Sequence, residues 1–512
     1  AREMLIAAAA ATWGVPAAEC VARDHGVRHE ASGRSAGYGE LVGAAAELEM
    51  PAKVSFKSRD DYRYIGKAMD TIDGFAMTTG QAKYGIDIAL PGMLYASIER
   101  CPAVGGTLVS LDDSAAKSTT GVSHVLQLPD STSPPLFNPL GGVAVLADNT
   151  WAAQRGRKAL KIEWDRGANA GYDSGPYREA LIETARKNGR TILERGDVDA
   201  AFADAKSVIE AEYFAPHLAQ APMEPPVATA VMTEDGGCEV WACTQDPQSA
   251  RETVAAVLGI DKEQVKVNVT LLGGAFGRKS KSDFIAEAAW LARETGRPVK
   301  VTWTREDDIR HGYFHSVSAQ CLKAAIDSDG NTQAWRQCTT FPSIGSTFDA
   351  AVTGPDAGEL GLGCTDNPFD VPNMRLEAGD AKAHLRIGWL RSVCNVYHAF
   401  ANACFADEIA HLVGMDPKDH LLKLLGRTRH IDPADDGAEY QNYGASLDVH
   451  PIDTGRIKAV VEKVAEMSGW GRVLPKGHGL GIAVHRSFLS TVGTVAEVSV
   501  DDAGKLVINE LW

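Results

Sequence analysis

The 512-residue sequence lacks several features that define specialised classes of protein. It contains no apolar run of roughly 18 residues, so no transmembrane helix is predicted within it. It also lacks an excess of positive charge, because 51 Lys and Arg face 67 Asp and Glu and the net charge is -16. Such a chain would repel a phosphate backbone, which argues against nucleic-acid binding. With 45% hydrophobic and 23% charged residues, the composition is that of a soluble globular protein,.

Cysteine is scarce and irregularly placed. The nine cysteines are an odd number and include no CxxC pair. This spacing predicts isolated thiols, with no disulfide framework, structural zinc site or iron–sulfur cluster held by this chain. The cysteines are Cys20, Cys101, Cys238, Cys243, Cys321, Cys338, Cys364, Cys394 and Cys404.

Several catalytic signatures are missing as well. GxSxG is absent, which argues against a Ser–His–Asp hydrolase, and so is the GxxxxGK[ST] loop of kinases and ATPases,. His311 and His315 are spaced i, i+4, but no HExxH frame accompanies them,. Glu408 and His411 match half of a di-iron site that has no second copy,. We therefore expect these residues to have structural roles.

The pattern of predicted strands and helices indicates an α+β (mixed α/β) fold with about two to four domains. Residues 1–62 begin with a predicted helix that ends at Gly14, and residues 63–170 read as short strands separated by Gly and Pro turns,. Residues 196–427 alternate strand and helix, and residues 428–512 begin a further domain. Neither chain end completes a layer, which predicts that the sequence is an internal portion of a longer polypeptide.

The most informative stretch is "GGAFGRK", residues 273–279. Residues 265–271 alternate like a strand, and the apolar residues of 284–292 share one helix face, so the glycines lie in a strand-to-helix loop,. Backbone N–H groups beside a helix N-terminus, together with the basic residues of 278–281, suit a phosphate or an oxo-anion. A tight turn with solvated lysines explains the same residues equally well.

Three further residues stand where α/β proteins often bind ligands, and each has a simpler alternative. Gln245 follows a predicted strand, but a glutamine there more often closes a loop by hydrogen bonding. Glu224 precedes two prolines that would hold it rigidly, as they would an ordinary turn carboxylate. Arg391 precedes a long helix and could bind an anion bidentately or form an ion pair. That helix is predicted to bury Phe400, Ala403, Cys404, Ile409 and Leu412.

In their order and spacing, these motifs resemble the large molybdenum-binding subunit of the xanthine dehydrogenase and aldehyde oxidase family. The branch that the chain resembles most is the isoquinoline 1-oxidoreductase β-subunit type, which includes periplasmic aldehyde dehydrogenases of bacteria. The resemblance covers nearly the whole chain. It is carried by the segments "YGIDIALPGMLYASIERCPAVGG", "MEPPVATA", "CTQDPQSARETVAAVLGI", "LLGGAFGRK" and "GWLRSVCNVYHAFANACFADEIA".

The resemblance implies a fold with a small aldehyde oxidase-type α/β hammerhead domain and larger molybdenum cofactor-binding domains. Residues 63–170 would be the hammerhead domain. Residues 1–62 would be an N-terminal piece of a cofactor-binding domain, residues 196–427 the first such domain, and residues 428–512 the truncated start of the second.

The resemblance also implies roles for individual residues. Gln245 matches the family's glutamine beside the apical oxo ligand of molybdenum and is the expected catalytic residue of this chain. Residues 273–277 match the loop that offers backbone N–H groups to the molybdenum centre and the pterin. Ala275 replaces a family glycine there, which requires that its φ be negative. The implied cofactor-binding positions are Gln245, Gly273, Gly274, Ala275, Phe276, Gly277, Arg278, Arg391 and Ser392.

Met223 and Glu224 match the "MEPP" signature of the branch and are candidates for the substrate pocket. Ser280 stands where purine hydroxylases carry a substrate-binding glutamate, which argues against a xanthine-like purine. The resemblance places the general base, a glutamate, outside this chain. No residue is expected to ligate a metal directly, because molybdenum is held through the pterin.

The implied activity is the oxidation of aldehydes to carboxylic acids with water as the oxygen source. The implied cofactor is molybdenum–molybdopterin in its cytosine dinucleotide form. Electrons would pass to [2Fe–2S] clusters on a small partner subunit and then to a membrane-anchored cytochrome c subunit, in the periplasm. Hydroxylation of N-heteroaromatics such as isoquinoline is the alternative. A protein of another class, either a non-catalytic cofactor-binding or maturation protein or an inactive fragment, also stays open.

Overall fold

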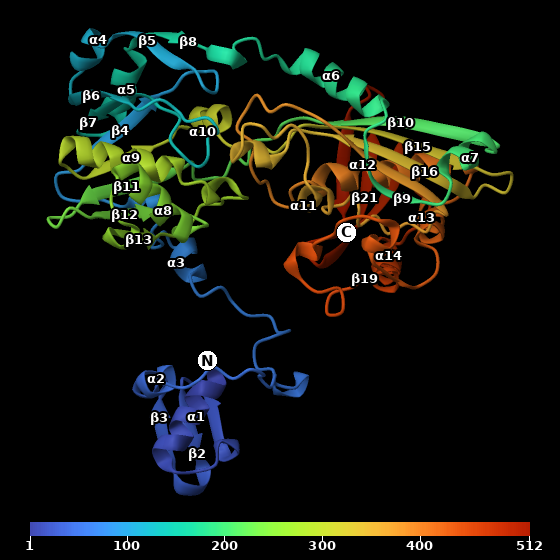
Figure 1. Ribbon diagram of the computed structural model, residues 1–512, viewed down its shortest axis with the longest axis horizontal. Helices are drawn as coiled ribbons and strands as arrows, with labels where there is room; N and C mark the ends of the chain where they lie inside the picture. Colours follow the sequence, from blue (N-terminus) through green and yellow to red (C-terminus); the bar gives the residue numbers. More distant parts are fainter. The chain divides into compact units, whose positions relative to one another are not determined.

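The computed structural model describes residues Ala1–Trp512 (Figure 1). The chain divides into two compact units, Ala1–Ala82 and Lys83–Trp512. Helices and strands occur throughout, which confirms the mixed α/β fold class, and all the cysteines are free thiols as predicted. None of the helices combines the length and apolar character needed to span a bilayer.

The first unit packs helices against a three-stranded antiparallel sheet. Its elements are α1 (Arg2–Trp13), β1 (Cys20–Arg23), β2 (Gly26–His29), β3 (Arg34–Gly37), α2 (Tyr38–Ala46) and α3 (Gly74–Thr78). α1 ends at Gly14, whose φ of 65° is the left-handed conformation of a C-cap glycine,. Ala9, Val27 and Leu41 are buried at the centre of its small core.

A seven-stranded mixed sheet forms one body of the second unit (Figure 1). Its order is β13 (Val265–Val269), β12 (Cys238–Ala242), β11 (Val227–Met232), β14 (Val299–Thr302), β4 (Leu94–Glu99), β7 (Gly142–Ala147) and β6 (Val122–Leu128). β12 and β13 run parallel and are joined by the crossover helix α8 (Pro247–Leu258). β4 pairs parallel with β14, so strands from residues 63–170 and 196–427 share this sheet.

Helices cover this sheet with buried apolar faces. α9 (Asp283–Thr295) lies against β11 and β14 and buries the predicted apolar residues of 284–292 completely. α5 (Thr150–Lys158) packs on β4 and β7. A separate two-stranded ribbon pairs β5 (Thr107–Asp112) with β8 (Lys161–Asp165), and α4 (Ser114–Lys117) follows β5.

A five-stranded sheet forms the second body of this unit (Figure 1). Its order is β10 (Ser207–Ala215), β15 (Ser318–Ile326), β16 (Thr332–Thr340), β17 (Asn373–Gly379) and β9 (Arg190–Arg195). α6 (Ser174–Arg186) and α7 (Val198–Ala203) pack against its strands. α12 (Asn395–Val413) packs against β10 and β15.

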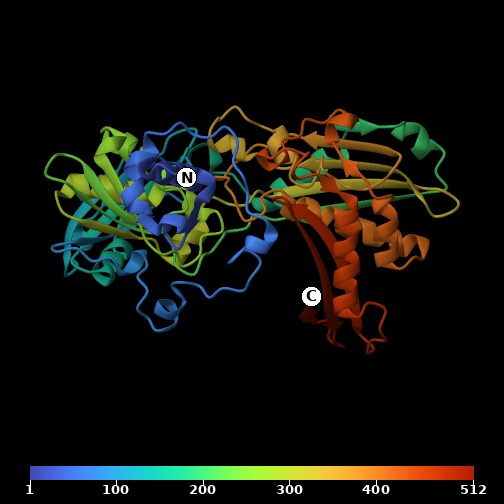
Figure 2. The same ribbon diagram turned by 90° about the horizontal axis from the view of Figure 1, so that it is seen from below.

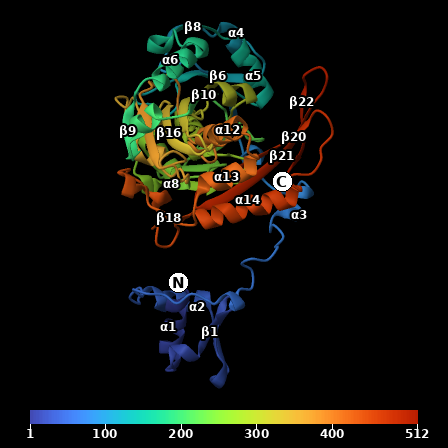
Figure 3. The ribbon, with the colours of Figure 1, turned by 90° about the vertical axis from the view of Figure 1, so that its right-hand side faces the viewer.

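The last part of the chain adds a three-stranded antiparallel sheet of β20 (His478–Ser487), β21 (Ser490–Val500) and β22 (Leu506–Leu511). α14 (Thr454–Ser468) runs along β20 and β21 (Figures 2 and 3). α12 also contacts β20 and therefore lies between the two sheets. The remaining elements are α10 (Arg305–His311), α11 (Ala357–Leu360), α13 (Pro417–Leu425), β18 (His430–Ile431) and β19 (Ile452–Asp453).

The predicted core face of α12 is partly wrong. Ile409 is buried as predicted, and Ala403 and Cys404 are half-buried. Phe400 and Leu412, however, are 46% and 49% exposed. Because α12 packs on two sheets, Ala401, Phe405 and Ile409, which are spaced four apart, face the core,. The side chains of Phe400 and Leu412 lie on another face of the helix. Phe400 instead rests edge-on against the ring of Tyr213, with the ring centroids 5.6 Å apart.

Candidate functional site

The candidate site lies beyond the carboxyl ends of two neighbouring parallel strands, at one edge of the seven-stranded sheet. Gln245 lies just beyond the carboxyl end of β12, and the loop 273–277 follows β13. The backbone N–H of Gly277 donates a hydrogen bond of 3.0 Å to Oε1 of Gln245. The side-chain oxygen is thereby fixed, and the amide NH2 of Gln245 has no partner within the chain. The predicted convergence of these two loops is present in the structure.

The loop presents free backbone donors. The N–H groups of Gly274, Ala275 and Phe276 take part in none of the hydrogen bonds within the chain. Ala275 has a negative φ, as its replacement of a glycine required, whereas Phe276 adopts a φ of 56° that is rare for a bulky residue,. Strained backbone of this kind persists where the surroundings impose it, and it is frequent at ligand sites.

Gly277 is needed because the chain approaches itself closely. Its φ is 105°, and a Cβ atom there would overlap the carbonyl oxygen of Trp389. The segment that contains Trp389 is thereby pressed against the loop. The N–H of Arg391 donates to the Phe276 carbonyl at 3.0 Å, which ties the same segment to the loop a second time.

Arg391 joins this cluster with a free cationic group. Its guanidinium carbon lies 5.2 Å from the centre of the Phe276 ring, and the guanidinium takes part in no ion pair or side-chain hydrogen bond of the chain. The ion pair considered as the alternative for this residue is therefore not formed. Ser392 and Val393 follow with φ values of 72° and 49°, so the backbone beside the arginine is strained as well,.

The basic residues of the loop are buried, so the alternative of solvated lysines is wrong. Arg278 forms hydrogen bonds of 2.9 and 3.0 Å with Asp283, which also pairs with Arg386 at 2.9 Å. Burial alone would raise the pKa of Asp283, but these guanidinium groups hold it below its ordinary value. The side chain of Arg278 is thus turned into the protein, and only its backbone adjoins the loop.

Lys281 supports the loop from beneath. Its Nζ donates to the Gly277 carbonyl at 3.1 Å and to the Ser280 hydroxyl at 2.8 Å, and lies 3.5 Å from the centre of the Trp389 ring. Burial lowers its pKa to about 6. Lysine side chains at this loop therefore hold protein groups in place.

The two residues of the "MEPP" signature are placed differently. Met223 is 90% exposed, whereas the Glu224 carboxylate lies under the loop and accepts a hydrogen bond from the Gly273 N–H at 3.1 Å. Neither residue lines the cavity beside Trp389, whose walls carry several aromatic side chains. The structure therefore brings together Gln245, the loop 273–277 and Arg391, with Glu224 beneath them.

The aromatic cavity has a volume of about 460 Å³. Trp389, whose carbonyl lies against Gly277, forms part of its wall, whereas Gln245 and residues 273–277 do not line it. The motifs of the sequence did not identify this cavity, because its aromatic residues come from separate irregular segments that show no periodicity. They are Phe348, Trp389, Tyr440, Tyr443 and Phe488.

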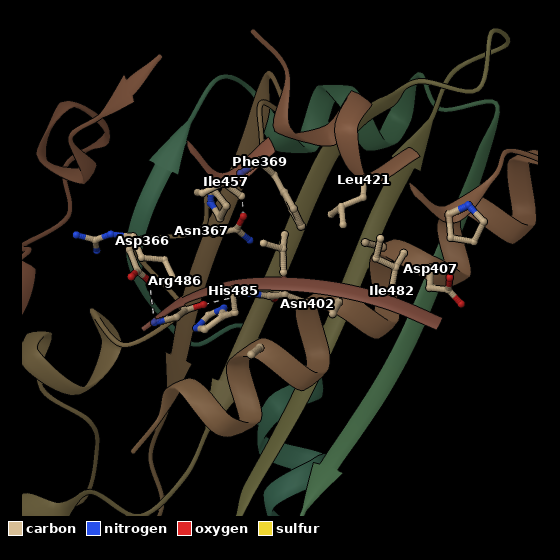
Figure 4. Close-up of a pocket in the computed structure, with 17 residues that line it drawn as sticks. Asp366, Asn367, Phe369, Asn402, Asp407, Leu421, Ile457, Ile482, His485 and Arg486 are labelled. Atoms are coloured by element: carbon tan, nitrogen blue, oxygen red, sulfur yellow. Dashed lines mark hydrogen bonds between the residues drawn. The ribbon is translucent and has the colours of Figure 1, made fainter. Parts of the chain in front are cut away.

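A second cavity lies between β20 and α12 and is too small for an organic substrate (Figure 4). Its volume of about 30 Å³ suits a water molecule,. Asp366 Oδ2 and Asn402 Oδ1 are buried there without a partner. Such atoms are the expected partners of an internal water. The other polar residues that line the cavity are Asn367, Asp407, His485 and Arg486.

Replacing Asp366 with Asn is expected to change how stability depends on pH. Burial raises the pKa of Asp366 from 3.8 to about 7, so this group stabilises the fold fully below 3.8 and loses that contribution as pH rises through 7,. Relative to wild type, the variant should gain free energy of unfolding from pH 5 to 8, by at most about 1.4 kcal/mol per unit. Urea unfolding at pH 5 and pH 8 measures the difference in the free energy of unfolding between the variant and wild type. An equal difference at both pH values would contradict the prediction.

Comparison with known proteins finds a matching domain profile and several relatives. A profile of the molybdopterin cofactor-binding domain matches residues 182–422. The β-subunit of the isoquinoline 1-oxidoreductase of Brevundimonas diminuta is 29% identical, over 100% of this chain and 67% of its own length. The membrane-bound aldehyde dehydrogenase [pyrroloquinoline-quinone] of Gluconacetobacter polyoxogenes is 31% identical, over 92% of this chain and 62% of its own. A nicotinate dehydrogenase subunit of Pseudomonas putida is 29% identical, over 84% and 36% respectively.

Solved structures share the fold. The aldehyde oxidoreductase of Desulfovibrio desulfuricans superposes with a TM-score of 0.63 at 18% identity, covering 92% of this chain and 55% of its own. The quinoline 2-oxidoreductase of Pseudomonas putida gives a TM-score of 0.61 at 19% identity, covering 86% and 62%. The chain thus spans about half to two thirds of most of these relatives.

The protein carries a molybdopterin cofactor-binding domain. Its sequence is similar to subunits named for isoquinoline 1-oxidoreductase and nicotinate dehydrogenase, which confirms the resemblance that its motifs predicted. The site fits such a cofactor: consecutive free N–H groups, a neutral amide donor and an unpaired guanidinium lie on and beside one loop. These groups are suited to the oxygen atoms of an oxo-metal centre and a pterin phosphate.

Proposed function

We propose that this protein is the molybdenum-binding subunit of a hydroxylase that oxidises aldehydes to carboxylic acids with water as the oxygen source. The observation that carries the proposal is the row of free N–H groups at Gly274, Ala275 and Phe276, fixed beside Gln245. Trp389, which lies against the same loop, also lines an aromatic cavity. Preorganised donors of this kind stabilise negative charge that develops in a reaction.

The residues of this chain would position and polarise the cofactor, and the cofactor would supply the oxidation. When bound, the molybdenum centre supplies two-electron oxidation and oxygen transfer. The N–H groups of residues 274–276 and the Gln245 amide would donate hydrogen bonds to it, and Arg391 would balance its negative charge. We propose that the general base is a glutamate outside these 512 residues.

The cavity supports an organic substrate of moderate size. Its volume of about 460 Å³ is in the range of small-molecule sites,. The relative at 31% identity is named an aldehyde dehydrogenase, which supports an aldehyde as the first choice. The aromatic walls would also stack on a planar ring, and a relative at 29% identity is named for isoquinoline, which supports an N-heteroaromatic as the second choice,.

Partners and location follow from the same proposal. Two relatives are named as single subunits of an isoquinoline 1-oxidoreductase and a nicotinate dehydrogenase, which supports a complex of several chains. We propose that a small subunit with [2Fe–2S] clusters receives the electrons and passes them to a membrane-anchored cytochrome c in the periplasm. We also propose that the cofactor has its cytosine dinucleotide form. A non-catalytic maturation protein would bind the same cofactor without turning over a substrate.

A steady-state assay of the cofactor-loaded complex tests the proposal. We expect acetaldehyde to be oxidised with a higher kcat/KM than isoquinoline, and the acid to contain oxygen-18 when the reaction runs in labelled water. Preference for isoquinoline, with the label in its product, would select the N-heteroaromatic alternative. If molybdenum is bound and neither compound is oxidised, the proposed activity is wrong and a maturation role is favoured.

A further inference from the structure

We infer that Glu224 is the positioning residue that holds both ends of the cofactor loop. One carboxylate oxygen, Oε2, accepts the Gly273 N–H at 3.1 Å and the Lys279 ammonium at 2.9 Å. Gly273 begins the loop and Lys279 follows its end, so this one oxygen atom binds groups at both ends of the loop. The inference rests on the proposed function only for the identity of the ligand.

The carboxylate is itself fixed from several directions. The Glu224 N–H donates to the Gly273 carbonyl at 2.9 Å, and Oε1 accepts the Ile86 N–H at 3.2 Å. Pro225 and Pro226 follow directly and restrict the backbone of Glu224 to extended conformations,. The Glu224 side chain is 9% exposed, so little solvent competes for these bonds. The residue behaves as a rigid anchor.

Gly273 allows the close approach that this anchor requires. A Cβ atom on Gly273 would lie 2.5 Å from the Cβ of Glu224, a separation that packed side chains do not adopt. The loop therefore starts directly against Glu224. Any residue other than glycine at position 273 would push the loop and the carboxylate apart.

Lys279 extends the anchor to Gln245. Its side chain is 0% exposed, and its carbonyl oxygen accepts the Gln245 N–H at 2.9 Å and the Thr244 hydroxyl at 3.1 Å. A lysine held by Glu224 thus carries on its own backbone the bond that places Gln245. Both halves of the candidate site, the loop and the glutamine, depend on the Glu224–Lys279 pair.

The free N–H groups of the loop are therefore held in position before any ligand binds. Held at both ends, residues 274–276 keep their donors in place without rearrangement, which is what strong oxyanion binding requires. Removing one partner of a buried pair leaves the other charge uncompensated, so the loop should loosen when either Glu224 or Lys279 is neutralised.

Hydrogen exchange in Glu224→Gln tests the inference. In the full chain without added cofactor, we expect the Gly273 and Gln245 amides to exchange roughly tenfold faster than in wild type. We also expect the loaded variant to release its pterin faster. The matched control is Glu377→Gln, because Glu377 is buried and pairs with Arg336 at 2.6 Å in the five-stranded sheet. That variant should leave both amides unchanged.

A double variant protects the test against misfolding. Glu224→Gln with Lys279→Met removes both buried charges, so we expect it to fold better than either single variant and still to exchange fast at Gly273 and Gln245. Unchanged exchange at both amides in the single and double variants would overturn the inference. Faster exchange in a protein that binds no molybdopterin would support the anchor and contradict the proposed function. Unchanged exchange in a variant whose wild-type protein binds molybdopterin would support the proposed function and contradict the anchor.

Discussion

Replacing Gln245 with Ala is expected to lower kcat by about 10² to 10³ while the protein keeps its molybdopterin, because one preorganised hydrogen-bond donor of the site is lost. The Gly277 N–H fixes Oε1 of Gln245, so the NH2 group is the part left to meet the cofactor. Steady-state kinetics, with pterin released and quantified from the same sample, measures both effects.

Two controls separate the donor from its surroundings. Gln245→Glu keeps an oxygen for the Gly277 N–H but has no NH2 group, so we expect a loss similar to that of the alanine variant,. Gln248, an exposed residue of α8 that bonds Glu252, should be replaceable by Ala without effect. Wild-type turnover in Gln245→Ala at full cofactor content would contradict the role given to this residue.

Replacing Gly277 with Ala is expected to displace the loop and empty the site. The new Cβ would overlap the Trp389 carbonyl, and the φ of 105° is unfavourable for any L-residue with a side chain,. We expect a loss of roughly 3 kcal/mol or more in the free energy of unfolding, together with most of the bound molybdopterin. Chemical denaturation and cofactor analysis would measure these losses.

Gly259 provides the matched control. It also has a positive φ, 68°, but a Cβ atom there would meet nothing within 4 Å. Gly259→Ala should therefore cost only about 1 kcal/mol from its backbone conformation and should leave the cofactor bound. If both variants behaved alike, the contact between Gly277 and Trp389 would not be what shapes the loop.

The elements around the site were predictable because they are locally regular. Alternation before Gly273 and the apolar face that follows it placed the loop between a strand and a helix, as the structure has it. The parallel pairing of β12 with β13 then brings Gln245 to the same edge. Both predictions therefore rest on local patterns, and the only contact distant in sequence that they need is the pairing of those two strands.

The rest depends on contacts that no local pattern records. Arg278 and Lys281 look like solvated charges in the sequence, but Asp283 and the Gly277 carbonyl meet them inside the protein. The aromatic cavity gathers Phe348, Trp389 and Phe488 from separate irregular segments. The anchoring role of Glu224 likewise emerges only when Lys279 folds back beside it.

In the proposed function, the loop 273–277 and Gln245 hold a molybdenum centre. Anomalous diffraction at the molybdenum absorption edge, on crystals of protein from a host that makes the cofactor, tests it most directly. We expect one peak beside the free N–H groups of residues 274–276 and the Gln245 amide. A molybdenum peak elsewhere in the protein, or none in crystals from such a host, would contradict it.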